Sequence, residues 1–449
     1  MYRLSIAVSA AVLVAAAALT EALRISSHVA PSPAPIWIGA VRTEAEARNI
    51  DIAFYERRAA RDPTGAMDLA RLAALFQQRA RETGNYEDVL RAEAAARRSL
   101  HNRTDRNAMA AQVLASALLS EHRFADALVV AARLAADDPD RVAYRAARGE
   151  IEMELGRYDA ARATFDSLAP HSRELPVASR LARWAEIEGH PNEARWRLKG
   201  ALRDALSRPD LPREQIAWYW LRVGDVEMRG GWIDSAEHSY RQGLAAHPDD
   251  YRLLAAIARL DASRHRWADA IAAGNQAIAS SLDPATFGTI SDAYLATGDQ
   301  VKADEYARGM EVAVSKQPGA YHRAWSLFLL DHNRRVRDVL RKARAELRTR
   351  RDIYGWDVLA WALYRQGRYA DAQRAMTLAL GQNTQDGLLF YHAGMIERAM
   401  GHRSAAEQRL GRALALNPYF HPSQPDTARA ALSELEHAGS AGQAAHAAP

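Results

Sequence analysis

The sequence repeats itself with a period of 34 residues between residues 353 and 418. Gly401 follows Gly367 by 34 residues, and Ala406 follows Ala372 by the same interval. Large, small and aromatic side chains recur in the same order in both segments. A fixed period of this length is typical of solenoids, in which each helix–turn–helix unit buries its apolar face only against its neighbours. The period therefore predicts an all-α chain of stacked helix pairs.

The same pattern extends in looser form toward the N-terminus. A small residue near the start of each second helix recurs at intervals of 33 to 42 residues, and the two longest intervals predict inserted loops at 101–106 and 207–213. A glycine before many second helices supplies the turn, because glycine adopts left-handed backbone angles without penalty. About ten helix pairs are predicted over residues 65–418. Their second-helix small residues are Val89, Ala127, Ala161, Ala194, Ala236, Ala270, Ala303, Asp338 or Val339, Ala372 and Ala406.

These units resemble the tetratricopeptide repeat (TPR) family over roughly residues 65–418. The resemblance is carried by the large and small residues at Trp356, Leu359 and Ala360 and by the closing Asn417-Pro418. The C-terminal segments RDIYGWDVLAWALYRQGRYADA and ALNPYF also resemble a family of uncharacterised bacterial exported TPR proteins. The resemblance implies a right-handed superhelix that binds peptide or protein segments in its concave groove and needs no cofactor.

The resemblance also implies which residues line that groove. Asp357, Trp361 and Tyr364 share one helix face because they follow 3–4 spacing. Aromatic side chains there are candidate peptide anchors, and packing between adjacent repeats is an equal alternative. The lysine and asparagine set with which some TPR proteins bind acidic peptide C-termini is not found. The implied groove residues are Trp218, Arg259, Asp292, Tyr354, Asp357, Trp361, Tyr364, Tyr391 and Arg398, with Arg183 and Arg252.

A strongly basic stretch occupies residues 334–351. It holds nine arginine and lysine residues against Asp338 and Glu346. One interpretation is a surface for an anionic partner, such as phospholipid head groups, an acidic polymer or an acidic protein. The other is the solvated outer face of a second helix whose inward side carries Leu340 and Leu347. The arginines at 3–4 spacing that form this stripe are Arg334, Arg337, Arg341, Arg344 and Arg348.

The segments outside the repeats predict the location of the protein. Residues 1–24 place Arg3 before a short apolar run, which is typical of a signal peptide or a signal anchor. We therefore expect a protein that is exported to the periplasm, either free or attached to the membrane through this segment. The other predicted segments are a Pro-rich linker at 25–42, a degenerate opening helix at 43–64, a capping helix at 419–437 and a disordered tail at 438–449.

Composition and motifs argue against several classes of function. The chain has no cysteine, which excludes disulfides and thiolate metal sites. Its net charge is only +4, with mostly interspersed charges, so no nucleic-acid partner is expected. No GxSxG, GxxxxGK[ST], GxGxxG or HExxH motif is present. The histidines are scattered, and His392, in an apolar context, is predicted to be a core residue rather than a metal ligand.

The sequence as a whole predicts a non-enzymatic exported scaffold that binds a peptide or protein segment without a cofactor or metal. Two alternatives stay open. One is an accessory factor in cell-envelope assembly or polysaccharide export, and the other is a cytoplasmic regulatory scaffold.

Overall fold

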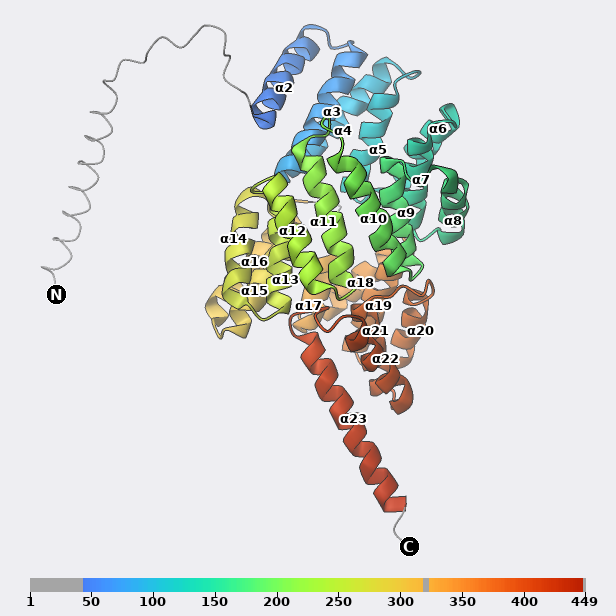
Figure 1. The fold of residues 1–449 in the computed structure, drawn as a ribbon, viewed down its shortest axis with the longest axis vertical. Coiled ribbons are helices and arrows are strands. Elements are labelled where there is room, and N and C mark those ends of the chain that lie inside the picture. Colours follow the sequence, from blue (N-terminus) through green and yellow to red (C-terminus); the bar gives the residue numbers. More distant parts are fainter. Residues whose placement is uncertain (1–42, 318–322, 447–449) are drawn as a thin grey trace, which may run out of the picture. The chain divides into compact units, whose positions relative to one another are not determined.

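The structure, a computed structural model, describes residues 43–317 and 323–446 (Figure 1). Within these ranges the secondary structure consists of α-helices, together with one short 3-10 helix at Ala169–His171, and there is no strand. The predicted signal segment 1–24 and linker 25–42 lie outside the described residues. None of the helices in the described ranges has the length and apolar character needed to cross a bilayer.

The chain divides into two units, one that ends at Ala47 and one that begins at Arg48. The described part of the first unit is the start of α2 (Glu44–Arg61). The Thr43 backbone amide donates to Glu46 Oε2 at 2.8 Å, and the Glu46 amide donates to Thr43 Oγ1 at 3.2 Å. This reciprocal pair satisfies two backbone donors at the helix start, which is why the sequence TEAE begins a helix here.

The second unit is built from ten consecutive helix pairs among its described residues, as the 34-residue period predicts. The predicted small residues lie near the start of the second helices and are buried, and in the eighth pair that residue is Val339 rather than Asp338. The chain is therefore a tetratricopeptide-repeat-like helical solenoid. The pairs are α3 (Ala66–Thr83) with α4 (Tyr86–Asn102), α5 (Ala108–Ser120) with α6 (Phe124–Asp137), α7 (Val142–Glu154) with α8 (Tyr158–Ser167), α9 (Leu175–Ile187) with α10 (Pro191–Leu206), α11 (Arg213–Arg229) with α12 (Ile233–Ala246), α13 (Tyr251–Ser263) with α14 (Trp267–Ser280), α15 (Pro284–Ala296) with α16 (Gln300–Ser315), α17 (Arg323–Asp331) with α18 (Val336–Glu346), α19 (Ile353–Arg365) with α20 (Tyr369–Ala379), and α21 (Gly387–Ala399) with α22 (Arg403–Leu416).

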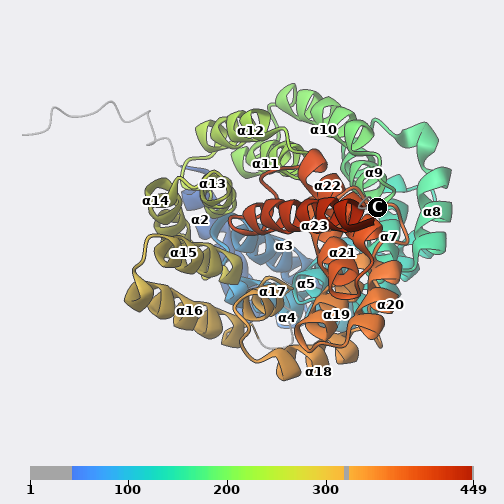
Figure 2. The ribbon, with the colours of Figure 1, turned by 90° about the horizontal axis from the view of Figure 1, so that it is seen from below.

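The two helices of a pair approach each other closely at a small residue of the first helix. A Cβ on Gly224 would lie 2.4 Å from a ring carbon of Tyr240, and a Cβ on Gly394 would lie 2.6 Å from Leu410 Cγ. Larger side chains at these positions would separate the helices, because protein interiors leave no spare volume. Within this unit the first helices α9, α11, α13 and α15 lie inside, and the second helices α10, α12, α14 and α16 lie outside (Figure 2).

Successive turns of the solenoid touch one another. The Arg351 amide donates to the Leu155 carbonyl at 3.1 Å, and the Asn417 side chain donates to the Met228 carbonyl at 2.8 Å. The turn between α7 and α8 thus lies against the loop that follows α18, and the turn between α11 and α12 lies against the loop that follows α22. In both cases the two elements are separated by five helix pairs along the chain. One large apolar cluster accordingly joins residues of α7 to α9 with residues of α16 to α23.

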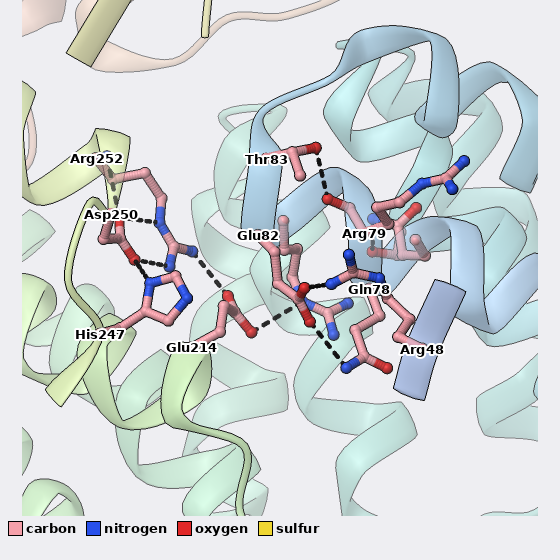
Figure 3. A network of polar contacts seen from close by, with 12 residues as sticks. Arg48, Gln78, Arg79, Glu82, Thr83, Glu214, His247, Asp250 and Arg252 are labelled. Carbon is pink, nitrogen blue, oxygen red and sulfur yellow. Dashed lines mark hydrogen bonds and ion pairs between the residues drawn. The ribbon is translucent and has the colours of Figure 1, made fainter. Parts of the chain in front are cut away.

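An ionic network links α3 to α11 and α13 (Figure 3). Glu214 lies 3.6 Å from Arg81 Nε and accepts from Arg252 Nη1 at 2.9 Å. Arg252 also pairs with Asp250 at 2.6 Å, and Asp250 lies 3.5 Å from His247 Nδ1. Because Glu214 and Asp250 are nearly inaccessible to solvent, these pairs are protected from screening by salt.

The last helix, α23 (Gln424–His446), follows the array. Ala428 and Ala431 of this helix are buried in the large apolar cluster, and Leu432 and Leu435 pack against it. The sequence predicts a capping helix that ends at residue 437 and a disordered tail from 438, but the helix continues through the described residues of that tail. The physical reason is its composition: no proline occurs between Pro425 and Pro449, and alanine favours helix.

Candidate binding groove

The first helices place several arginines around one cavity of 610 Å³. Arg183 comes from α9, Arg222 and Arg229 come from α11, and Arg323 begins α17. Arg222 and Arg229 are seven residues apart on α11, so they project from the same face of the helix. The cavity is also lined by Glu150, Glu154, Ser179, Arg180, Trp218, Tyr354 and Asp386.

Glu186 holds three of these arginines in place. Its carboxylate lies 2.6 Å from Arg229, 3.4 Å from Arg183 and 4.0 Å from Arg222. Burial opposes ionisation of Glu186, but the charges of these guanidinium groups outweigh it and lower the pKa of the carboxyl below its usual value. Arg222 also pairs with Asp225 at 3.4 Å. Each guanidinium carries five N–H donors, so these two carboxylates do not use all the donors of the three arginines that line the cavity.

Tyr354 lies between two of the cavity arginines. The guanidinium carbons of Arg183 and Arg323 lie 5.5 Å and 4.8 Å from the centre of its ring. Both distances are within the range of cation–π attraction. Burial raises the pKa of the Tyr354 phenol although Arg183 opposes the shift, so the ring stays neutral at physiological pH and presents a hydroxyl group.

A second cavity of 650 Å³ adjoins the first and shares Arg229, Arg323 and Asp386 with it. Its walls include Arg259, Asp292 and part of the segment 417–424, which connects α22 to α23. We refer to the two cavities together as the groove. The groove is therefore bounded on one side by the chain's own C-terminal segment.

Residues 417–424 are held to the rest of the array by specific contacts, and one of the contacting residues, Asp331, lines the groove. The Pro422 carbonyl lies 2.8 Å from His265 Nε2, and Gln424 Nε2 donates to Asp331 Oδ1 at 3.1 Å. The ring of Phe420 lies 5.6 Å from that of Tyr391, centre to centre. The segment thus uses a main-chain carbonyl, a side-chain amide and an aromatic ring to lie along the inner helices.

The residues that the sequence assigns to the groove fall into two groups. Trp218, Arg259, Asp292 and Tyr354 line the cavities, as does Arg183. The others take different places. Arg398 pairs with Glu434 of α23, and Arg252 belongs to the network of Figure 3. Asp357, Trp361 and Tyr391 pack between repeats, and the half-buried Tyr364 packs on Trp361 and Tyr369 within its own repeat.

Trp361 shows why packing is the outcome for the second group. Its ring stacks on Tyr364 at 4.6 Å and on His392 at 4.1 Å, and its Nε1 donates to Asp331 Oδ1 at 2.8 Å. Only 2% of the Trp361 surface is exposed. The side chain is thereby used in contacts within the chain, and the prediction that it is an exposed peptide anchor is not met in this structure.

Asp357 is the centre of a buried ionic triad. His392 Nδ1 lies 2.6 Å from Asp357 Oδ1, and Arg323 Nη2 donates to Asp357 Oδ2 at 2.7 Å. Burial opposes ionisation of Asp357, but His392 and Arg323 lower the pKa of its carboxyl below the usual value. His392 is fully buried, as predicted for a core histidine. The described residues include no group of three or more acidic or histidine side chains placed to hold a metal ion.

Arg222, Arg229 and Arg323 were not identified from the sequence. The signal for Arg222 and Arg229 is their helical spacing from Trp218, which the sequence does assign to the groove. Inner-face positions of a solenoid helix recur every three or four residues, and this series on α11 is Trp218, Arg222, Asp225 and Arg229. Arg323 is the first described residue after the gap at 318–322, and no local pattern marks it.

The stripe Arg334, Arg337, Arg341, Arg344 and Arg348 lies on and beside α18, and all five side chains are exposed. Leu340, Ala343 and Leu347 are buried on the opposite side, as the sequence predicts for the inward face. The stripe therefore occupies the surface of a second helix, away from the residues that line the groove.

Comparisons with known proteins concern the fold only. No protein-family profile and no curated protein matches the chain. Among solved structures, the chain is similar to that of the APC/C hetero-tetramer Cut9–Hcn1, with 12% identity over 87% of this chain and 93% of that chain and a TM-score of 0.34. A tetratricopeptide repeat protein from Parabacteroides merdae ATCC 43184 has 15% identity over 58% and 98% of the two chains and a TM-score of 0.34. PilW, described as a widely conserved type IV pilus biogenesis factor, has 17% identity over 50% and 99% and a TM-score of 0.39.

Proposed function

We propose that this chain is a non-enzymatic scaffold that binds an extended segment of a partner protein in the groove. The observation that carries the proposal is the non-helical segment 417–423, part of which lines the second cavity of the groove. His265 meets a main-chain carbonyl of this segment at 2.8 Å, and Asp331 accepts from a side-chain amide at 3.1 Å. Walls that hold one non-helical segment through main-chain and side-chain groups offer the same kinds of contact to a segment of another protein.

The open part of the groove defines what a partner segment would meet there. Arg183, Arg222 and Arg229 share Glu186, and Arg222 also pairs with Asp225, so these cavity-lining arginines have more donors than the two carboxylates use. Glu150, Glu154 and Asp386 add acceptors on the same walls. Such a mixed surface favours a polar segment whose acidic and amide side chains accept from the guanidinium groups, because charge-assisted hydrogen bonds are stronger than neutral ones.

We also propose that this scaffold acts on the exported side of the membrane, in the periplasm. Support comes from the basic start and short apolar run of residues 1–24. A role in assembling the cell envelope is compatible with the same location. The mass of the mature protein from the native host would test this step: loss of the first residues indicates cleavage, and an intact N-terminus in the membrane fraction indicates an anchor.

Peptide selection tests the groove while the partner is still unidentified. A displayed library of random peptides would be selected on the wild-type protein. Affinities of the enriched peptides would then be measured for a groove variant, Trp218→Ala with Arg222→Gln. A matched control changes an outer-face pair on α10, Trp196→Ala with Arg197→Gln. Trp196 is 67% exposed, and Arg197, like Arg222, is paired with a carboxylate of its own helix.

We expect the affinity of the enriched peptides to fall about tenfold or more in the groove variant, because an aromatic contact and a charged donor are both lost. The control should keep its affinity. Equal losses in the two variants, or failure to enrich any peptide, would overturn the proposal.

A further inference from the structure

The basic stripe borders a third cavity, which lies outside the groove. We refer to this cavity as the hollow. Its volume is 490 Å³, and it is lined by residues of α18, by Arg348 just after that helix, and by residues of the turn that joins α19 to α20. Arg337, Arg341, Arg344 and Arg348 form one side, and Arg368 and Gln366 of the turn form the other. The lining contains no carboxylate. Residues from two consecutive helix pairs thus bring five guanidinium groups to one place.

Most of these arginines are not neutralised by the described part of the chain. Among the described residues, no carboxylate lies within ion-pair distance of the guanidinium groups of Arg337, Arg344 and Arg348, although the charge of Arg344 acts on Asp371. Arg341 pairs with Asp338 at 3.0 Å, and Arg368 pairs with Asp371 at 2.8 Å. Two carboxylates therefore face five guanidinium groups, in a chain whose net charge is only +4.

Stability of α18 does not explain this arrangement. Cations near a helix C-terminus are favourable, which would account for Arg344 and Arg348. Arg337, however, lies in the first turn of α18, where the helix dipole disfavours positive charge. Like charges one turn apart, as at Arg337 and Arg341, also repel each other. The positive charges of Arg337 and Arg341 therefore do not stabilise α18 itself.

The turn before α18 is anchored to α16. Asn333 and Arg335 both adopt positive φ angles, 53° and 49°. Arg334 is tied to Asp304 of α16 at 2.9 Å, and Arg335 is tied to Glu311 of α16 at 2.6 Å. The two arginines that precede α18 are thus paired with carboxylates of α16, whereas neither of them lines the hollow.

We propose that this hollow is a binding site for a phosphate-bearing anion, either the head group of an anionic phospholipid or a soluble polyphosphate. The planar fork of arginine matches the geometry of phosphate oxygens and forms paired, charge-assisted hydrogen bonds with them. Several such groups around one hollow favour a multiply charged ligand over a single carboxylate. The site is independent of the groove, because none of its residues lines the groove cavities.

Binding of two probes to the full chain tests the site. One probe is inorganic tripolyphosphate, followed by calorimetry, and the other is vesicles of phosphatidylglycerol and phosphatidylcholine, followed by sedimentation. The test variant carries Arg337→Gln, Arg344→Gln and Arg348→Gln. The control carries Arg57→Gln, Arg71→Gln and Arg98→Gln, which removes the same charge from three exposed arginines elsewhere. Pure phosphatidylcholine vesicles measure any binding through residues 1–24.

We expect the test variant to lose about tenfold or more in affinity and the control to stay close to wild type. Removing mutual repulsion should leave the thermal midpoint of the test variant unchanged or higher, so a loss of binding would not reflect unfolding. If the test variant loses affinity for the vesicles alone, the ligand is a lipid head group. If it loses affinity for tripolyphosphate, the ligand is a soluble phosphate. Polyglutamate, measured as a carboxylate control, should bind more weakly than either probe. Equal losses in the control variant, absence of binding to both probes, or equally tight binding of polyglutamate would overturn the proposal.

Discussion

Gly189 and Asn383 meet across two successive turns of the solenoid, and a Cβ on Gly189 would stand 2.3 Å from the Asn383 carbonyl oxygen. The glycine also adopts a φ of 82°, which disfavours any other residue. Gly156 has the same relationship to Arg351, and Gly231 has it to Leu416. These turn glycines therefore allow two layers of helix pairs to pack in addition to reversing the chain.

Gly189→Ala should destabilise the protein much more than Gly367→Ala. Both glycines have positive φ, so both substitutions carry the backbone penalty of about 1 kcal/mol. Only Gly189 has neighbours, since nothing lies within 4 Å of a Cβ built on Gly367. Thermal unfolding of the two variants should give a clearly lower midpoint for Gly189→Ala. Equal midpoints would mean that the contact between turns is not rigid.

The repeat pattern predicted the helix pairs but not the contacts between turns of the solenoid. Buried small residues such as Ala161 and Ala372 recur at fixed intervals because each pair packs on its immediate neighbours, and a period records that requirement directly. The contact of Gly189 with Asn383 depends instead on curvature accumulated over five intervening pairs. No single repeat encodes that curvature, so the two residues carry no shared sequence signal.

Asp357→Ala should cost about 3–5 kcal/mol of unfolding free energy, because it leaves Arg323 and the buried His392 without their shared anion. The comparison is Asp234→Ala, which removes the partner of Arg264 at a site where the aspartate is 92% exposed. An exposed pair of that kind contributes about 1 kcal/mol or less. Chemical denaturation of both variants measures the difference. Similar values would show that the triad adds little to stability.

The same triad explains why only part of the groove was predictable. Helical spacing puts Asp357 and Trp361 on one face, and that inference is correct. Whether such a face meets solvent or a neighbouring repeat depends on the side chains across it, here His392 and Asp331. Trp218 and Tyr354 border open cavities because arginines, rather than apolar rings, stand opposite them.

Stability should fall in acid partly through Asp250. Burial opposes ionisation of this carboxyl, but hydrogen bonds from His247 and Arg252 outweigh it, and the pKa lies well below its ordinary value of 3.8 (Figure 3). Because the pKa of Asp250 is lower in the folded than in the unfolded protein, the ionised carboxylate stabilises the fold at pH values above the unfolded-state pKa. This contribution is lost as the pH falls through the unfolded-state pKa toward the lower folded-state pKa.

The variant Asp250→Asn isolates that contribution, because asparagine still caps the start of α13 but does not titrate. It should be less stable than wild type at neutral pH, and the difference should narrow as the pH drops below about 4. Thermal midpoints measured across that range test the expectation. A difference that stays constant with pH would assign the effect of the substitution to packing instead.

Asn417 should control how firmly the segment 417–424 is held in the groove. Its side chain donates to the Met228 carbonyl at 2.8 Å and accepts from the Tyr419 amide at 2.8 Å, and only 2% of the residue is exposed. Asn417→Ala removes both bonds and deprives the Tyr419 amide of the acceptor that holds it, which is unfavourable. Amide hydrogen exchange of the segment should therefore accelerate in this variant.

Tyr419→Ala is the control, because that ring is 37% exposed and its loss should leave exchange nearly unchanged. If exchange in the segment is as fast in wild type as in Asn417→Ala, the segment does not occupy the groove stably, and the template on which the proposed peptide binding rests would be lost.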